Sequence, residues 1–226
     1  MDSIEATAGT PPCARAELRV PAGLGGRSKR ALDVTVSLAL LLFTAPLLLV
    51  IALAVKAQDG GPVLFRHTRC GRGGRAFSLW KFRTMRVDAA ERLAGLLAED
   101  PHAEAEWVRT RKLRRDPRVT RLGRFLRRSS LDELPQLLNI LRGDMSIVGP
   151  RPVMAEELAR YGPAAPLMRA ARPGVTGLWQ VSGRNDLDFE TRVRLDAAYV
   201  RGWSFLGDVV ILARTVPVVL TARGAY

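Results

Sequence analysis

The feature that most constrains the fold is an uncharged apolar run from Val34 to Val55 (VTVSLALLLFTAPLLLVIALAV). Its 22 residues would form a helix about 33 Å long, which is enough to cross the hydrocarbon core of a bilayer. The run is too long, and starts too late, for a cleaved signal peptide. We therefore expect a membrane helix near the start of the chain.

Two details complicate a simple membrane span. Pro46 lies near the middle of the run, where a proline removes the hydrogen bond to the Leu42 carbonyl and forces a kink or a break. The Thr44 hydroxyl is a candidate partner for a freed backbone group. Basic residues also flank both sides, and the positive-inside rule then places both ends in the cytoplasm. A re-entrant helix satisfies that rule and is favoured, while a spanning helix with a tolerated proline stays open. The basic residues are Arg27, Lys29 and Arg30 before the run, and Lys56, Arg66, Arg69, Arg72 and Arg75 after it.

The charge of the chain indicates an anionic partner. The 226 residues carry a formal net charge of +13, which suits nucleic acid, an anionic membrane surface or phosphorylated substrates. An aromatic content of 6% argues against a stacking platform for single-stranded nucleic acid. Cysteines 13 and 70 and histidines 67 and 102 are isolated, which gives no support for a disulfide framework or a zinc site and argues against a Ser-His triad.

The rest of the chain reads as short elements separated by turns. Residues 1–27 are rich in Pro, Gly and Ala and predict a disordered tail. Two strand-like stretches, from Phe65 and over Phe77 to Phe82, flank a turn at Gly71 to Gly74. The run from Arg118 to Arg128 predicts an amphipathic element with a basic face. Further predictions are a strand-like run over 174–184, helices over 156–160 and 189–199, and a helix over 205–220 that lies in the interface or packs on the domain.

The dyad Asp132-Glu133 is the main candidate for a catalytic site in this sequence. Two adjacent carboxylates stand between a block of arginines and an apolar helix, where the helix dipole favours their ionised forms. An ionised aspartate among arginines can attack phosphorus while the arginines hold the phosphates. On spacing alone a capping box of Ser130 and Glu133 has the better odds. Pro135 instead favours a helix that starts nearer Leu134, with the dyad on the preceding turn.

Two later arginines sit in geometrically restrained positions. Arg151 stands between Pro150 and Pro152, so its backbone has little freedom. Arg184 follows a Ser-Gly turn at the end of a glycine-rich run.

Six short segments follow one another in a recognisable order. They are Lys29 to Asp33 (KRALD), Lys81 to Met85 (KFRTM), Arg121 to Arg124 (RLGR), Ser130 to Gln136 (SLDELPQ), Gly143 to Pro152 (GDMSIVGPRP) and Pro173 to Arg184 (PGVTGLWQVSGR). Together they resemble the bacterial sugar transferase family, the monotopic phosphoglycosyl transferases, from about residue 28 to the C-terminus. One departure is that Ala45-Pro46, preceded by Thr44, stands where the family often has a Ser-Pro pair at the membrane-helix break.

The resemblance implies a reaction and a set of site residues. A hexose-1-phosphate would pass from a UDP-sugar to undecaprenyl phosphate, with release of UMP, as a first membrane step in exopolysaccharide or glycan assembly. Asp132 would be the nucleophile that forms an aspartyl-phosphosugar intermediate, and Asp132 and Glu133 would bind Mg²⁺. The implied phosphate-binding residues are Lys81, Arg83, Arg124, Arg128, Arg151 and Arg184.

The expected fold is α+β and mainly helical. It comprises a re-entrant membrane helix over residues 28–58 broken at Pro46, interfacial amphipathic helices, and a compact cytoplasmic catalytic domain over 59–226. The chain then lies at the bacterial cytoplasmic membrane as a minimal catalytic unit, with room for a homodimer and without a nucleic-acid partner. The rival interpretations are a basic, membrane-tethered nucleic-acid-binding protein and a non-catalytic scaffold on anionic lipid. Neither rival gives the dyad a use.

Overall fold

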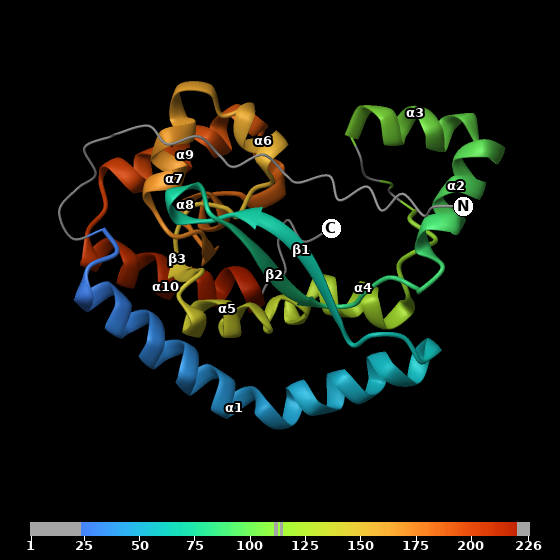
Figure 1. Ribbon diagram of the computed structural model, residues 1–226, viewed down its shortest axis with the longest axis horizontal. Helices are drawn as coiled ribbons and strands as arrows, with labels where there is room; N and C mark the ends of the chain where they lie inside the picture. The colour runs from blue at the N-terminus through green and yellow to red at the C-terminus, as the bar shows by residue number, and fades with distance from the viewer. Residues whose placement is uncertain (1–23, 111–112, 114, 221–226) are drawn as a thin grey trace, which may run out of the picture.

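The chain folds as a mainly helical α+β protein with a long N-terminal helix (Figure 1). The computed structural model describes residues 24–110, 113 and 115–220, and most of the predicted tail lies outside this range. Leu24 is buried against the core, so the packed part of the chain begins before residue 28. The helices are α1 (Arg27–Asp59), α2 (Ala89–Glu99), α3 (Pro101–Thr110), α4 (Arg121–Arg128), α5 (Gln136–Arg142), α6 (Ala155–Ala159), α7 (Ala165–Ala170), α8 (Leu178–Val181), α9 (Phe189–Arg201) and α10 (Phe205–Leu220). The strands are β1 (Leu64–Cys70), β2 (Ala76–Phe82), β3 (Ser146–Val148) and β4 (Gly174–Thr176).

Helix α1 continues through Pro46 rather than breaking there. Figure 1 shows it bent near its middle, where Pro46 falls in the sequence, so that its two halves curve around the body of the protein. The Thr44 hydroxyl donates to the Leu40 carbonyl at 2.6 Å, not to the Leu42 carbonyl that Pro46 leaves free. A hydroxyl bonded one turn back favours helix bending. Of the two predicted alternatives, a kink or a break, the structure shows a bend in a continuous helix.

Much of the surface of α1 is apolar and uncovered. Leu42, Phe43, Leu49, Val50 and Leu53 are each at least 61% exposed. By length and composition α1 qualifies as a helix that could cross a membrane, and 11% of its most apolar stretch is buried in the molecule. An exposed apolar helix of this kind requires an apolar environment.

The first turns of α1 are held inside the protein by a buried ion pair. The Lys29 ammonium lies 2.7 Å from Asp208 on α10 and donates to the Val148 carbonyl at the end of β3. The Asp208 carboxylate also accepts from the Tyr199 hydroxyl at 2.8 Å and from the Trp203 indole at 3.1 Å. Lys29 therefore attaches α1 to α9, α10 and β3. Its ammonium is buried in these contacts and does not belong to a basic flank that faces lipid.

Two neighbours of Lys29 complete this attachment. The buried Asp33 carboxylate accepts from the Ser146 hydroxyl at 2.8 Å and from the Ile147 amide at 3.0 Å. Arg30 donates to the carbonyls of Ile140 and Leu141, at 2.6 and 2.8 Å, and so satisfies the carboxyl end of α5. The KRALD segment is thus a docking element.

The two small sheets are built differently. Strands β1 and β2 confirm the two strand-like stretches predicted around the glycine turn, and they form an antiparallel hairpin in which Phe65 pairs with Lys81. Asn139 of α5 covers the free edge of β2, since its amide donates to the Ser78 carbonyl and its oxygen accepts from the Trp80 amide. Strands β3 and β4 pair in parallel and lie within the main core.

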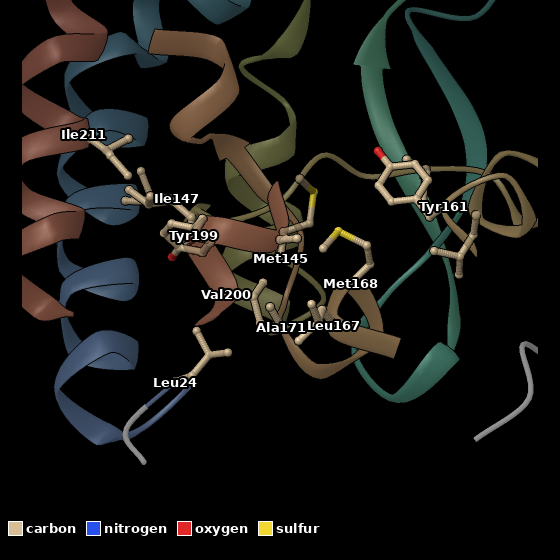
Figure 2. Packing of buried hydrophobic residues seen from close by; sticks show 14 of the residues in the cluster. Leu24, Met145, Ile147, Tyr161, Leu167, Met168, Ala171, Tyr199, Val200 and Ile211 are labelled. Atoms are coloured by element: carbon tan, nitrogen blue, oxygen red, sulfur yellow. Dashed lines mark hydrogen bonds between the residues drawn. The ribbon is translucent and has the colours of Figure 1, made fainter. Parts of the chain in front are cut away.

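Two clusters of buried side chains hold these elements together. The larger one joins β3, α7, α9 and α10, and Figure 2 shows part of it, including Ile147, Val200 and Ile211. The smaller one consists of Ile51 and Val55 of α1, Phe82 of β2 and Leu126 of α4. The second half of α1 therefore packs directly under the strand and helix that lead to the dyad.

The local predictions have mixed outcomes. Helices α6 and α9 confirm the helices predicted over 156–160 and 189–199, and α4 confirms the amphipathic element. Helix α10 packs on the domain through buried Asp208 and Ile211. The strand-like run over 174–184 is wrong after residue 176, because Leu178–Val181 is helical, with Trp179 buried. The glycines in this run mark a turn that leads into a helix, and the strand does not continue past them.

Removing one partner of the buried ion pair should strongly destabilise the protein. Lys29→Ala leaves the Asp208 carboxylate buried without its cation, and we expect a loss of about 3 to 5 kcal/mol in the free energy of unfolding. Chemical denaturation in detergent measures it. Asp88→Ala, which removes the exposed pair with Arg92, is the matched control and should cost less than about 1 kcal/mol. Equal losses in both variants would contradict the structural role of Lys29.

Candidate active site

The dyad lies on a tight turn between two helices. A single 3-10 turn, Leu131–Glu133, carries it, and α5 starts only at Gln136, directly after Pro135. Ser130 makes no side-chain cap, so the predicted capping box is wrong and the alternative with the dyad before the helix is confirmed. Proline at this position suits the start of a helix, which separates the turn from α5.

The turn is fastened to a distant loop through two strained residues. Ser130 and Arg184 have φ values of 58° and 54°, and no other non-glycine residue in the described part of the chain has a positive φ. The Arg184 guanidinium donates to the Ser130 hydroxyl at 3.4 Å. Left-handed backbone at a non-glycine residue costs energy and tends to occur where geometry is functionally constrained. The contact therefore brings the predicted site residue Arg184 to the edge of the dyad.

Lys81 is the cation closest to the dyad. It leaves strand β2 and places its ammonium 2.6 Å from the Glu133 carboxylate and 3.8 Å from that of Asp132. The side chain of Asp132 is 9% exposed and that of Glu133 is 35% exposed. One carboxylate is thus buried and the other is only partly exposed, with the same lysine facing both.

Burial raises the pKa of Asp132 to about 6. The Lys81 ammonium and the Arg127 guanidinium lower this pKa, while the neighbouring Glu133 raises it. The sequence predicted fully ionised acids on the strength of a helix dipole. For Asp132 that prediction overestimates how readily the carboxyl group ionises, because the loss of hydration on burial raises its pKa more than the nearby cations lower it. Its carboxylate is mainly ionised at neutral pH and becomes protonated below about pH 6.

Glu133 has the opposite balance. Burial raises its pKa, but the Lys81 ammonium, Arg151 and Arg184 together hold it below its ordinary value. Two of the predicted phosphate-binding arginines, from separate loops, therefore act electrostatically on the same carboxylate. The dyad thus combines an acid that titrates near neutrality with one that stays ionised.

Arg127 is a site residue that the sequence interpretation missed. It is half-buried on α4, donates to the Thr84 hydroxyl at 2.9 Å and interacts electrostatically with Asp132. Its position could have been found from helical spacing, because Gly123, Leu126 and Arg127 share one face of α4. Gly123 lets that face approach closely, since a Cβ there would lie 2.0 Å from the Thr84 carbonyl oxygen.

The other three predicted phosphate ligands differ in their exposure. Arg83 is buried, paired with Asp59 at the end of α1 and bonded to the Val55 carbonyl. Arg124 and Arg128 are exposed on α4, and Arg124 donates to the Val119 carbonyl at 3.4 Å. The structure therefore gathers Lys81, Arg151, Arg184 and Arg127 around the dyad, and gives Arg83 a partner in the membrane helix.

A buried aspartate, a neighbouring glutamate and converging cations form an arrangement suited to phosphorylated substrates. The chain belongs to the bacterial sugar transferase family, whose family model matches residues 25–222.

Three of the relatives are similar to this chain over most of its length. The chain is 52% identical over 204 residues to the exopolysaccharide production protein ExoY of Rhizobium meliloti, covering 90% of both chains. It is 48% identical over 213 residues to the undecaprenyl-phosphate galactose phosphotransferase of Salmonella typhimurium, covering 92% of this chain but 44% of that relative. A third relative, the UDP-glucose:undecaprenyl-phosphate glucose-1-phosphate transferase of Caulobacter vibrioides, is 45% identical over 206 residues, which cover 88% of this chain and 72% of the relative.

The pKa of Asp132 should depend on Lys81. In Lys81→Met the ammonium that lowers this pKa is gone, so the pKa should rise from about 6 by about one unit. Carbon NMR of aspartate carboxyl groups, assigned with Asp132→Asn, measures it. The control is Lys56→Met, whose amine binds the Gly60 carbonyl and which should leave the titration unchanged. An unaltered Asp132 titration in Lys81→Met would exclude direct coupling between the two groups.

Proposed function

We propose that this protein transfers a hexose-1-phosphate from a UDP-sugar to undecaprenyl phosphate and releases UMP. The observation that carries the proposal is the buried Asp132 carboxylate, held ionised at neutral pH between Lys81 and Arg127. Relatives named for undecaprenyl-phosphate galactose and glucose-1-phosphate transfer support the substrates, and ExoY supports a role in exopolysaccharide production.

In the proposed reaction Asp132 acts twice. Its carboxylate oxygen attacks the β-phosphorus of the UDP-sugar, the bond from that phosphorus to the bridging oxygen breaks, and UMP leaves. An oxygen of undecaprenyl phosphate then attacks the same phosphorus, the aspartyl bond breaks, and the polyprenyl diphosphate sugar forms. The bond between the sugar and its phosphate oxygen stays intact throughout, so the anomeric configuration is retained.

The cations around the dyad would bind the phosphates. Lys81, Arg151 and Arg184 converge electrostatically on Glu133, and phosphate oxygens can replace that carboxylate as their partners. Arg127 would hold the Asp132 carboxylate in place for attack. Arg124 and Arg128 remain proposed ligands from the exposed face of α4, while Arg83 fits better as the link between β2 and α1.

The dyad also fits the Mg²⁺ that the family resemblance implies. Mg²⁺ prefers oxygen ligands and is commonly held by one or two carboxylates together with substrate phosphates. The described residues contain no group of three or more acidic, histidine or cysteine side chains placed to hold a metal, so Asp132 and Glu133 would supply the protein ligands. When bound there, the ion would neutralise charge on the diphosphate.

We further propose that α1 enters and leaves the membrane by the cytoplasmic face. The bent helix runs along the outside of the folded body in Figure 1, and leucines such as Leu42, Leu49 and Leu53 are exposed. Both of its ends are fastened to that body, by Lys29 to Asp208 and by Asp59 to Arg83. Phe125 on α4 and Leu206 on α10 add exposed apolar side chains, as expected for interfacial helices. Residues 59–226 would then form the catalytic domain at the cytoplasmic surface.

The reaction is tested by UMP release from detergent-solubilised protein supplied with undecaprenyl phosphate, Mg²⁺ and a panel of UDP-sugars. At least one donor should give UMP, and Asp132→Asn should reduce the rate by about 10³-fold or more, because the amide cannot attack phosphorus. The rate should fall as the pH drops below about 6, since the raised pKa of Asp132 leaves its carboxyl protonated there.

The matched control for this assay is Asp144→Asn, an acid beyond α5 that hydrogen-bonds Asn139 and lies outside the proposed machinery. It should retain the activity of the wild-type protein. Folded protein that releases no UMP with any donor, or an active Asp132→Asn variant, would refute the assignment.

The topology is tested by thiol labelling in spheroplasts. After Cys13 and Cys70 are replaced by serine, single cysteines at the exposed positions Ser28 and Gln58 report the two ends of α1. Both should react with a membrane-impermeant reagent only after lysis, because both face the cytoplasm. Phe43→Cys, at the most exposed apolar position, should stay unreactive throughout. Labelling of one end in intact spheroplasts would establish a spanning helix instead.

A further inference from the structure

Asp196 is a buried acid that the reaction proposed above does not use. It lies on α9 and is 1% exposed. One carboxylate oxygen accepts from the Arg151 backbone amide at 3.4 Å. The other makes no hydrogen bond of normal geometry, although the Tyr161 side chain lowers the pKa of the carboxyl group. A buried carboxylate with an unsatisfied oxygen is costly, so stability alone does not explain its presence.

Arg151, whose backbone amide donates to Asp196, lies between two prolines. In Pro150-Arg151-Pro152 neither proline has an N–H, so the Arg151 amide is the one backbone donor of these three residues. On the other side of the turn the Pro150 carbonyl accepts from the Gly174 amide at 2.8 Å. The turn is therefore held by β4 through one group and by α9 through Asp196.

The side chain of Arg151 connects this turn to the dyad. Its guanidinium lies 5.2 Å from the ring centroid of Trp179, which is also approached by Arg192 at 5.8 Å. It also lowers the pKa of Glu133. A shift of the Arg151 backbone would thus move a cation that faces the reacting groups.

The surroundings of Asp196 offset only part of the cost of burying its charge. Burial raises its pKa to about 7, against the opposing effects of the Arg151 amide and guanidinium and of Tyr161, while Glu157 raises it further. Because the folded-state pKa lies above the ordinary value of 3.8, stability is lost as the pH rises toward 7 and the cost is fully present at pH 8. A neutral acceptor at this position should therefore be at least as stable.

We propose that Asp196 is a positioning residue for the transferase reaction, which holds the Arg151 turn so that the guanidinium faces the substrate phosphates. The inference rests on the proposed function. It assigns α9 a part in the site, although no side chain of α9 needs to touch the substrate. Misplacing a phosphate-binding group by about 1 Å is enough to slow a reaction by about a hundredfold.

The test compares four variants by lipid-dependent UMP release and by UDP binding. Asp196→Ala should lower kcat/KM by about ten- to a hundredfold, whereas Asp196→Asn, which keeps an acceptor for the Arg151 amide, should stay within about threefold of wild type. Arg151→Ala should lose activity, and adding Asp196→Ala to it should cause little further loss, because Asp196 acts through Arg151.

A control separates positioning from general stability. Tyr199→Phe removes buried hydrogen bonds from the same helix and should lower the melting temperature while leaving kcat/KM unchanged. If Asp196→Ala melts below the assay temperature, Asp196→Leu supplies the same loss of acceptor with a larger side chain.

The possible results are distinguishable. The positioning role would be overturned if the losses of kcat/KM in the two single variants multiply in the double variant. It would also be overturned if Asp196→Asn were as inactive as Asp196→Ala. Neither result would contradict the proposed reaction of the wild-type protein. A wild-type protein that neither binds UDP nor releases UMP would refute the proposed function and this inference with it.

Discussion

The buried ion pair between Lys29 and Asp208 is the interaction on which the arrangement of the protein depends. It joins the start of α1 to α10, and its hydrogen bonds extend to Tyr199 on α9 and to the end of β3. A buried pair is tolerable only when its remaining donors and acceptors are satisfied, and here the Val148 carbonyl, the Tyr199 hydroxyl and the Trp203 indole satisfy them. Such a pair specifies one position for α1, which its apolar surface alone could not do because apolar contacts are non-directional.

The position of α1 in turn determines the geometry of the site. Ile51 and Val55, in its second half, pack against Phe82 at the end of β2 and Leu126 in α4. Strand β2 carries Lys81 and α4 carries Arg127, the two cations that act on Asp132. Arg83, two residues after Lys81, binds Asp59 at the last turn of the same helix. The helix proposed to rest in the membrane therefore also supports the residues proposed to activate the nucleophile, and this would place the proposed chemistry close to a lipid substrate.

The sequence predicted those parts of the fold that depend on local patterns. Alternation around a glycine turn predicted the β1–β2 hairpin, and apolar spacing predicted α9. It failed where a residue's partner lies far away in the chain. Lys29 looked like a basic flank because Asp208 is 179 residues away, and nothing local to Arg83 indicated its ion pair with Asp59. The dyad itself was recognisable from composition and motif, but the burial of Asp132, which sets its pKa, depends on tertiary packing.

The net charge of +13 therefore does not measure how many cationic side chains are available to bind a ligand. Arg30 and Arg172 are engaged at the carboxyl end of α5, where they bind the carbonyls of Ile140, Leu141 and Gly143. Arg118 pairs with Asp116 and lies over Trp107, which connects α3 to the loop before α4. Arginine suits such work because its planar guanidinium can bond several carbonyls and stack on a ring while keeping its charge. In this chain arginines therefore stabilise the fold as well as lining the proposed phosphate site, and the best candidates for that site are those whose charge acts on the dyad.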